Sequence, residues 1–386
     1  MFGLPSQNYM DVVKMLKDYG FTDIVVGYNV DHINAVKKGG LKVHVVLPAF
    51  RIYDKYKDSK YLAEDVYGRK HVWFSSGCPN NPELRINLLN KVKEIVKALD
   101  VDGIILDGIR FASPGSGLEA FATCFCEECR RKADFTFRIS FDLMKNSVEN
   151  LLSCFYDFKK CREILELYNY SLDSYLYVSK NFKHILYWLE FRSRSIIEVV
   201  KDVRNLIKSI DSSVELGAYV FMPTLALLAG QDYTELWRYL DTIKPMIYRI
   251  GRGVSCLNYE LYITARDILK WNRWLKEEEI LEILYKIFGL DGLENLPKTL
   301  DELMSSGMPI DIVYRETSIA RKLIGNKCEL HPIIMFHDEY IVEAVQNVIK
   351  AGADGVDFFR YREEYKHHID KIAKVVKKLN ITVSGA

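Results

Sequence analysis

The chain has 386 residues with a formal net charge of +1, and 49% of its residues are apolar and 27% charged. This composition excludes a disordered, a collagen-like or a small disulfide-stapled protein, and the length allows one large barrel or two to three average domains. The balanced charge argues against a nucleic-acid partner. No apolar stretch is long enough to span a membrane and the first residues do not resemble a secretory signal, so we expect a cytoplasmic protein.

Short apolar, β-branched runs alternate with amphipathic helical stretches along the chain. In chain order, the runs cover residues 22–28, 41–48, 71–76, 101–107, 214–221, 242–249, 331–337 and 353–360. They are largely unbroken, which is typical of parallel strands buried on both faces. The alternation of eight strands with helices predicts an α/β fold of the (β/α)8 TIM-barrel type, and no glycine-rich nucleotide-binding motif follows the first strand.

Two segments are too long to be ordinary connections. Residues 108–180 follow the fourth predicted strand, residues 250–320 follow the sixth, and both are rich in helical patterns. We expect residues 1–386 to form a single barrel domain with these two helical insertions. Because the loops at the carboxyl ends of barrel strands build the active site, the insertions would wall that site.

The first candidate for chemistry is the run that ends at Asp107. This carboxylate is predicted at the carboxyl end of a buried strand, where it would point into the barrel mouth, and Arg110 follows three residues later. The arginine would lower the pKa of Asp107 and keep it ionised. An ionised carboxylate suits a glycosidase as nucleophile or oxocarbenium stabiliser, whereas a structural Asp–Arg pair is the alternative interpretation.

Further candidates for substrate binding follow the other predicted strands. Asn80 and Asn81 precede a helix that Pro82 would start, so either could cap that helix or bind sugar hydroxyls. Aromatic, basic and imidazole side chains near the predicted strand ends complete the candidate binding set: Tyr28, Arg51, Trp73, Tyr219, Tyr248 and His337.

Two further carboxylates could share the catalytic work with Asp107. Asp232 lies in the fifth loop, where it could equally cap a short helix. Asp338 follows the seventh predicted strand next to His337, and either side chain could act as an acid, a base or a metal ligand.

Three of the eight cysteines form a C-x-C-x-x-C cluster in the first insertion, at Cys124, Cys126 and Cys129. Three thiols within six residues can supply three ligands of a structural zinc, with Cys78 or a histidine as the fourth. A disulfide and free thiols remain the alternatives. Glutamine is scarce while lysine and isoleucine are plentiful, a thermophile-like composition that keeps the disulfide open even in a cytosolic protein.

Several motifs in succession resemble the glycoside-hydrolase-like barrel proteins of prokaryotes and, more distantly, the α-amylase and α-galactosidase clans. The motifs are GLKVHVVLPAF, CPNNPELR, VDGIILDGIRF, CFCEEC, WLEFR and GQDYTELWRYLDTIKPMIYR, and the resemblance extends over residues 20–365. It implies a (β/α)8 hydrolase with Asp107 in the position of the nucleophile. The chain departs from the related hydrolases because its fifth and sixth predicted strands end without a carboxylate, so Asp232, Asp338 or Glu260 would have to be the acid/base.

These observations leave three hypotheses. The first is a glycoside hydrolase that cleaves an oligosaccharide and requires no cofactor for catalysis. The second is a sugar-binding barrel without catalysis, since a fold does not determine a function. The third is a metal-dependent barrel hydrolase that uses His337 and Asp338. The sequence predicts a carbohydrate ligand and leaves the oligomeric state open.

Overall fold

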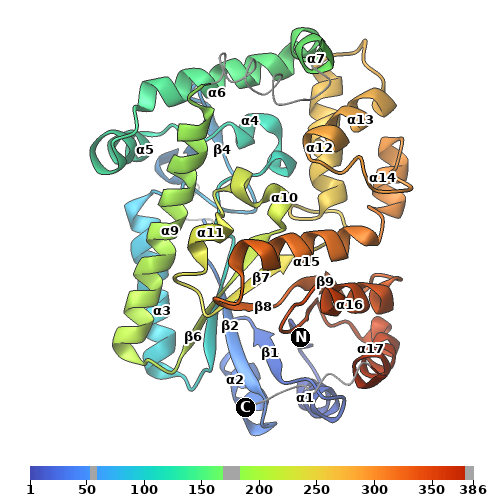
Figure 1. The fold of residues 1–386 in the computed structure, drawn as a ribbon. Coiled ribbons are helices and arrows are strands. Elements are labelled where there is room, and N and C mark those ends of the chain that lie inside the picture. Colours follow the sequence, from blue (N-terminus) through green and yellow to red (C-terminus); the bar gives the residue numbers. More distant parts are fainter. Residues whose placement is uncertain (53–58, 168–182, 379–386) are drawn as a thin grey trace.

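The computed structural model describes residues 1–52, 59–167 and 183–378. Its centre is a curled, mostly parallel sheet in the order β1-β2-β5-β6-β7-β9-β10, with β8 paired to β7, and helices surround it (Figure 1). The strands are β1 (Asp23–Val26), β2 (Lys42–Pro48), β5 (Gly103–Asp107), β6 (Glu215–Phe221), β7 (Thr242–Met246), β8 (Glu329–Leu330), β9 (Ile333–Met335) and β10 (Asp357–Phe359).

The first three residues of the chain close this sheet. Phe2 forms a parallel bridge with Val25 of β1, and the N–H of Gly3 donates to the carbonyl of Val25. On the other side, the N–H of Phe2 donates to Phe358 and its carbonyl accepts from Tyr361, so the segment also pairs with β10. The sheet is therefore curled and parallel, as predicted for a barrel of the TIM type, and residues 1–3 lie between its two edge strands, β1 and β10.

One of the predicted barrel strands is wrong. The run 71–76 does not enter the sheet; only its first residue belongs to a strand, β4 (Lys70–His71), which pairs antiparallel with β3 (Ala63–Glu64) outside the barrel. Phe74 and Ser75 have φ values of 48° and 55°, which an extended strand does not adopt. The apolar residues of this run pack in a loop instead.

The helices follow the strands in alternation. On the barrel flanks lie α1 (Tyr9–Asp18), α2 (Val30–Lys38), α3 (Pro82–Ala98), α9 (Ile185–Ile210), α10 (Pro223–Ala226), α11 (Tyr233–Leu236), α15 (Asp311–Ile324), α16 (Ile341–Lys350) and α17 (His367–Lys378). Helix α3 shows why these segments are helical: the Asn81 side chain accepts from the N–H groups of Glu83 and Leu84, and Pro82 takes the first turn. Its apolar face packs against α9.

Two long connections carry the remaining helices. Between β5 and α9 lie α4 (Leu118–Phe121), α5 (Glu127–Arg131), α6 (Phe141–Tyr156) and α7 (Phe158–Leu167). Between β7 and α15 lie α12 (Leu257–Trp271), α13 (Glu277–Ile287) and α14 (Leu300–Ser306). They form the upper part of Figure 1, away from α1 and α2. The predicted insertion bounds and the single domain remain predictions, and residues 168–180 lie outside the described residues.

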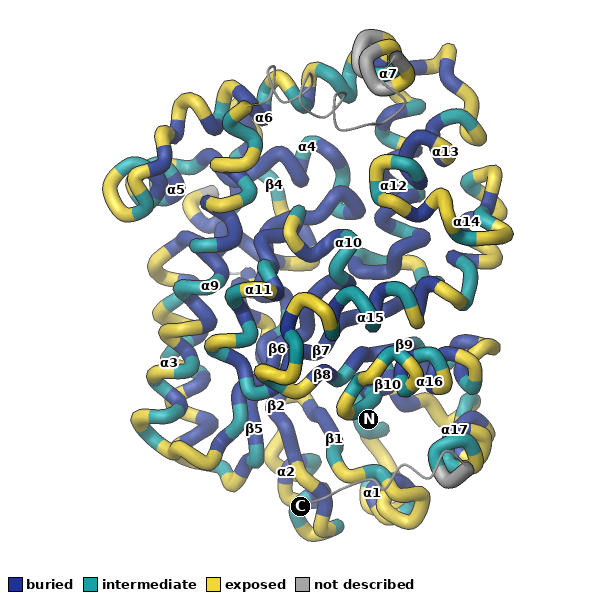
Figure 2. Tube along the Cα trace, in the orientation of Figure 1, coloured by how far each residue is buried: buried dark blue, intermediate teal, exposed yellow. Residues whose placement is uncertain are grey.

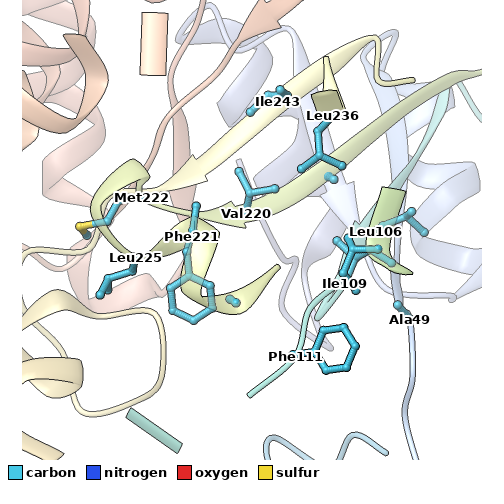
Figure 3. Close-up of a cluster of buried hydrophobic side chains, with 14 of the residues drawn as sticks. Ala49, Leu106, Ile109, Phe111, Val220, Phe221, Met222, Leu225, Leu236 and Ile243 are labelled. Atoms are coloured by element: carbon cyan, nitrogen blue, oxygen red, sulfur yellow. The ribbon is translucent and has the colours of Figure 1, made fainter. Parts of the chain in front are cut away.

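The core is continuous beneath these helices. Figure 2 shows the sheet as buried and the exposed residues on the outer sides of the flanking helices. In Figure 3, Leu106 and Ile109 of the β5 segment pack with Phe111, and Val220 and Phe221 of β6 lie beside them. Within the described part of the chain, no helix has the length and apolarity that a membrane crossing requires.

Polar groups fill the amino end of the barrel. Lys244 of β7 donates a 2.8 Å bond to Asp357 of β10, and both residues are buried. His44 of β2 contacts Asp23 of β1 at 3.0 Å. The carboxyl end is occupied instead by apolar and aromatic side chains, so the two ends of the barrel interior differ in chemistry.

Candidate active site

Asp107 lies at the carboxyl end of β5, in register with Pro48 of β2. The N–H of Gly108 donates a 2.8 Å bond to Asp107 Oδ1, and Gly108 has a φ of 64°. Glycine adopts this left-handed conformation without strain, so the chain can turn directly after the carboxylate. Asp107 Oδ2 has no hydrogen-bond partner in the described part of the chain and is not sealed off, so it is free to meet a ligand.

The pKa of Asp107 differs from the sequence prediction in its direction. Burial raises the pKa of Asp107, and the opposing effects of the Arg110 charge and the Gly108 N–H do not cancel it. Asp107 and Arg110 are both described and form no ion pair. Arg110 therefore acts on the pKa of Asp107 in the predicted direction, but burial outweighs it and the net shift is upward. The guanidinium donates to a main-chain carbonyl and not to the carboxylate.

Arg110 is buried, with 3% of its surface exposed. Its Nη1 donates a 3.0 Å bond to the carbonyl of Phe111. Two aromatic rings flank the guanidinium, with centroids 5.0 Å away for Phe221 and 6.0 Å away for Phe74. Burial lowers the pKa of Arg110, while the negative charges of Glu260 and Asp107 oppose that effect.

Glu260 fastens the loops that surround Arg110. It lies in α12 and is buried, and burial raises its pKa. Its carboxylate accepts bonds from Ser113 Oγ at 2.9 Å, from the N–H of Ser255 at 2.9 Å and from the N–H of Gly115. By accepting these three hydrogen bonds, the Glu260 carboxylate connects the loop after β5 to the loop after β7. To act as the acid/base, the alternative role predicted for it, Glu260 would have to give up some of these hydrogen bonds.

Two tyrosines stand inside the carboxyl half of the barrel. Tyr219 of β6 and Tyr248, just after β7, belong to the interior cluster and are each 4% exposed. Burial raises the pKa of both, and the negative charge of Asp107 acts in the same direction. Neither hydroxyl has a hydrogen-bond partner among the described residues, and neither is sealed from solvent. Asp107 and two phenol groups without a described partner therefore lie close enough for the charge of Asp107 to act on both tyrosines.

The aromatic residue exposed beside Arg110 is Phe74, not its predicted neighbour Trp73. Phe74 is 59% exposed, whereas Trp73 is 3% exposed and its indole N–H has no partner in the described region. The interpretation of residues 71–76 as a strand suggested Trp73, and not Phe74, as the exposed ring. The alternation of neighbouring side chains was the only signal that could have suggested Phe74.

The two other predicted carboxylates are engaged in different ways. Asp232 caps α11, and its Oδ1 accepts from the N–H and the hydroxyl of Thr234 at 2.9 and 2.6 Å. Asp338 is buried, and its two oxygens bind Arg249 at 2.6 and 2.7 Å. Asp338 Oδ1 also accepts from the N–H of Tyr340. Neither carboxylate interacts with Asp107 in any contact of the described chain.

The four cysteines Cys78, Cys124, Cys126 and Cys129 meet beside the start of α3. Their sulfur atoms all lie within 4.8 Å of one another, and all four thiols are free. Cys78 Sγ lies 3.5 Å from Cys129 Sγ and 3.6 Å from Cys126 Sγ. A tetrahedral zinc with bonds of about 2.3 Å holds its sulfur ligands about 3.8 Å apart, so this spacing fits a metal and is far too long for a disulfide.

Donors around the cysteine cluster suit thiolate ligands. The N–H of Asn80 donates to Cys78 Sγ and its amide Nδ2 to Cys129 Sγ, both at 3.4 Å, and the N–H of Glu64 donates to Cys124 Sγ. Hydrogen bonds of this kind orient and stabilise sulfur atoms that bind a metal. Among the residues that the structure describes, this cluster is the one group of side chains arranged to hold a metal, and it does not include His337 or Asp338.

No protein-family model and no curated protein matches the sequence. Solved structures match in fold, among them a β-galactosidase from the haloarchaeon Halorubrum lacusprofundi, with 13% identity and a TM-score of 0.59 over 100% of this chain and 58% of that one. The PgaB (BpsB) glycoside hydrolase domain from Bordetella bronchiseptica matches with 10% identity and a TM-score of 0.55, over 94% of this chain and 91% of that domain. A β-galactosidase from Bacillus circulans sp. alkalophilus matches with 12% identity and a TM-score of 0.55, over 98% of this chain and 55% of that one. The chain therefore shares the barrel fold of these proteins, and it spans less than two thirds of the length of the two β-galactosidases.

In this barrel, the two predicted asparagines stabilise the structure around α3. Asn81 caps α3, which is one of the two predicted alternatives. The amide Nδ2 of Asn81 donates to the carbonyl of Lys60. Asn80 donates to Ser195 Oγ at 3.1 Å as well as to the cysteine cluster, and accepts from Arg85. The hydrogen-bonding groups of both amides are thus occupied within the protein.

The remaining predicted residues lie around the barrel without joining Asp107 in a described contact. Tyr28 is exposed and donates to Glu94 of α3. Arg51 is exposed and bridges Ser76 through the main chain. His337 is partly buried next to the ring of Tyr365, at a centroid distance of 5.9 Å, and burial lowers its pKa. Their binding roles remain predictions.

Proposed function

We propose that this protein is a glycoside hydrolase that cleaves an oligosaccharide, with Asp107 as its catalytic carboxylate. One observation carries the proposal: a half-buried carboxyl group with an unbonded oxygen stands at the carboxyl end of β5, beside two free tyrosine hydroxyls. Barrel enzymes have their active sites at this end of the strands. The fold shared with β-galactosidases and the PgaB hydrolase domain adds support for a carbohydrate substrate.

The raised pKa of Asp107 favours a specific role for this residue. A protonated carboxyl group can donate its proton to the glycosidic oxygen as the bond to the anomeric carbon breaks. This role differs from that of the nucleophile, which the family resemblance implied. Tyr219 and Tyr248 would hold the sugar by donating from their hydroxyl groups. Asp232 is the better second carboxylate, because its Oδ2 has no hydrogen-bond partner among the described residues, whereas both oxygens of Asp338 bind Arg249.

Leaving-group chemistry distinguishes the two roles of Asp107. If Asp107 is the acid, the Asp107→Asn variant should lose about 10²–10⁴-fold in kcat on an oligosaccharide, and much less on a dinitrophenyl glycoside, whose phenol leaves without protonation. If Asp107 is the nucleophile, both substrates should lose activity to a similar extent. Full activity of Asp107→Asn on both substrates would contradict a catalytic role. Asp142→Asn, on the exposed outer face of α6, is the matched control.

A sugar-binding barrel without catalysis is the second candidate. This candidate is favoured because no second carboxylate contacts Asp107 among the described residues. Such a protein would bind oligosaccharides with the same affinity before and after Asp107→Asn and would release no reducing ends. Turnover by the unmodified protein that disappears in Asp107→Asn would reject this candidate.

We also propose that the four cysteines bind a structural zinc ion. The argument is the donor set: four sulfurs at metal-like spacing, buried or partly buried, with N–H groups directed at three of them. A four-sulfur zinc site is closed, so it stabilises a fold and performs no chemistry. Here it would join the start of α3 to the first long insertion.

A further inference from the structure

The donors of buried arginines are used very unevenly in this protein. Arg192 is fully buried and donates to four main-chain carbonyl groups. Arg249 is 6% exposed and donates to Asp338 and to two carbonyl groups. Arg110 is 3% exposed, yet it makes one hydrogen bond, to Phe111, and no ion pair in the described part of the chain. A buried charge normally has a partner, so Arg110 is the exception that needs an explanation.

The unused donors of Arg110 form one edge of its guanidinium group. Nη1 is bonded to the carbonyl of Phe111, which leaves Nε and Nη2. Neither of these atoms has a described partner and neither is sealed within the protein, so both remain available to a ligand. Nε and Nη2 together are the pair that binds a carboxylate through two parallel hydrogen bonds.

The surroundings hold this edge in place. The rings of Phe221 and Phe74 flank the guanidinium, and the bond to Phe111 restricts its rotation. Arg110 also lies close enough to Asp107 for their charges to interact without an ion pair. A group bound at this edge would therefore sit beside the proposed catalytic carboxyl.

The charges near the mouth favour an anion as the ligand. Arg252 follows β7 and Arg360 follows β10; both are exposed and neither forms an ion pair in the regions described. The nearby Asp338 is neutralised by Arg249. The two guanidinium groups of Arg252 and Arg360 at strand ends would attract acidic glycans.

We propose that the site takes an acidic sugar, a uronic acid residue whose carboxylate binds Nε and Nη2 of Arg110. This inference rests on the proposed function, because it names the substrate class of the same site. A planar carboxylate matches the planar edge of the guanidinium better than a tetrahedral sulfate ester does. Charge-assisted pairs of this kind change affinity by about 10- to 100-fold, which sets the size of the expected preference.

The test uses the full chain with paired substrates. We would measure kcat/KM on aryl glucuronides and galacturonides against the matching glucosides and galactosides, and binding of free glucuronate and galacturonate by NMR titration. The expected result is a preference for the uronides of at least about tenfold. Arg110→Gln should remove this preference by lowering uronide activity, and Arg110→Lys should retain part of it. Arg238→Gln, at the opposite, amino end of the sheet, should leave it unchanged.

The outcomes separate this inference from the proposed hydrolase activity. Turnover of neutral glycosides with no uronide preference would overturn the acidic-sugar site and leave the hydrolase standing. Tight uronate binding without turnover of any glycoside would support the acidic-sugar site and overturn the hydrolase activity. Stronger binding of a sulfated sugar than of a uronate would overturn the carboxylate assignment. If Arg110→Gln does not fold, a wild-type preference that Arg110→Lys leaves undiminished would also contradict the proposal.

Discussion

Lys244 and Asp357 form an ion pair inside the barrel, with 2.8 Å between Nζ and Oδ2 and both side chains almost fully buried. Lys244→Met would leave the Asp357 carboxylate buried without its partner, so we expect a loss of about 3–5 kcal/mol in the free energy of unfolding. The double variant Lys244→Met, Asp357→Leu should recover most of this loss. Urea denaturation measures both changes.

A matched control for this prediction lies on the surface. Lys298 and Glu278 are 75% and 65% exposed and 3.6 Å apart. Lys298→Met should leave the denaturation midpoint unchanged, since exposed pairs contribute little. Equal effects of the buried and the exposed substitution would show that the Lys244–Asp357 pair has no special importance.

We expect Asp107 to reduce the stability of the folded protein at pH 7 while it takes part in catalysis. Its pKa in the folded protein is raised by burial, so the fold favours the protonated form. The associated stability is fully present below the unfolded pKa and is lost as the pH rises through the folded pKa. Asp107→Asn should therefore raise the melting temperature at pH 7 and have little effect at pH 3, while it abolishes hydrolysis of oligosaccharides. A lower melting temperature at pH 7 would contradict this assignment.

The same group predicts the pH dependence of activity. If Asp107 donates a proton, kcat falls as the pH rises through its raised pKa, because the acid form disappears. The pH–rate profile of a slow substrate should show this loss on its alkaline side. In Asp107→Asn, that limb should be absent from any residual activity on an activated aryl glycoside.

Metal content tests the cysteine cluster. The purified protein should contain one zinc ion per chain, and Cys129→Ser should reduce the zinc content and lower the melting temperature. Cys328→Ser is the control, because Cys328 is a free cysteine outside the cluster. Elemental analysis of both variants is sufficient. A metal-free protein whose melting temperature does not change with added zinc would exclude the site.

Phe74 should affect substrate binding more than the chemical step. Its ring is 59% exposed next to Arg110, where it can cover an apolar sugar face. We expect Phe74→Ala to raise KM by about 3- to 10-fold with little change in kcat, which corresponds to the usual contribution of an aromatic contact. Phe135→Ala removes a ring that is 80% exposed on a different segment, and it should change neither parameter.

The sequence predicted the parts of the fold that long apolar runs encode. Seven of the eight predicted runs overlap strands of the barrel sheet, because parallel strands buried on both faces leave a continuous apolar signal. The remaining run, residues 71–76, is not a barrel strand but a loop that buries Trp73 and exposes Phe74. The segment that does complete the barrel, residues 1–3, is too short to carry any periodic pattern.

The candidate site was predictable in position but not in its interactions. The end of a predicted strand was enough to place Asp107 near Tyr219 and Tyr248. The spacing of residues 107 and 110 suggested an ion pair, but sequence spacing does not determine where a guanidinium points. Three cysteines were recognisable from their spacing, whereas the choice of Cys78 as the fourth depended on the fold around α3.

The pairing of Phe2 with both Val25 and Phe358 makes the barrel wall depend on contacts between opposite ends of the polypeptide. Such sequence-distant contacts raise the contact order and slow folding. During synthesis, the circle of strands stays open until β10 has left the ribosome. Until then, the edge of the growing sheet is unpaired and can pair with other chains.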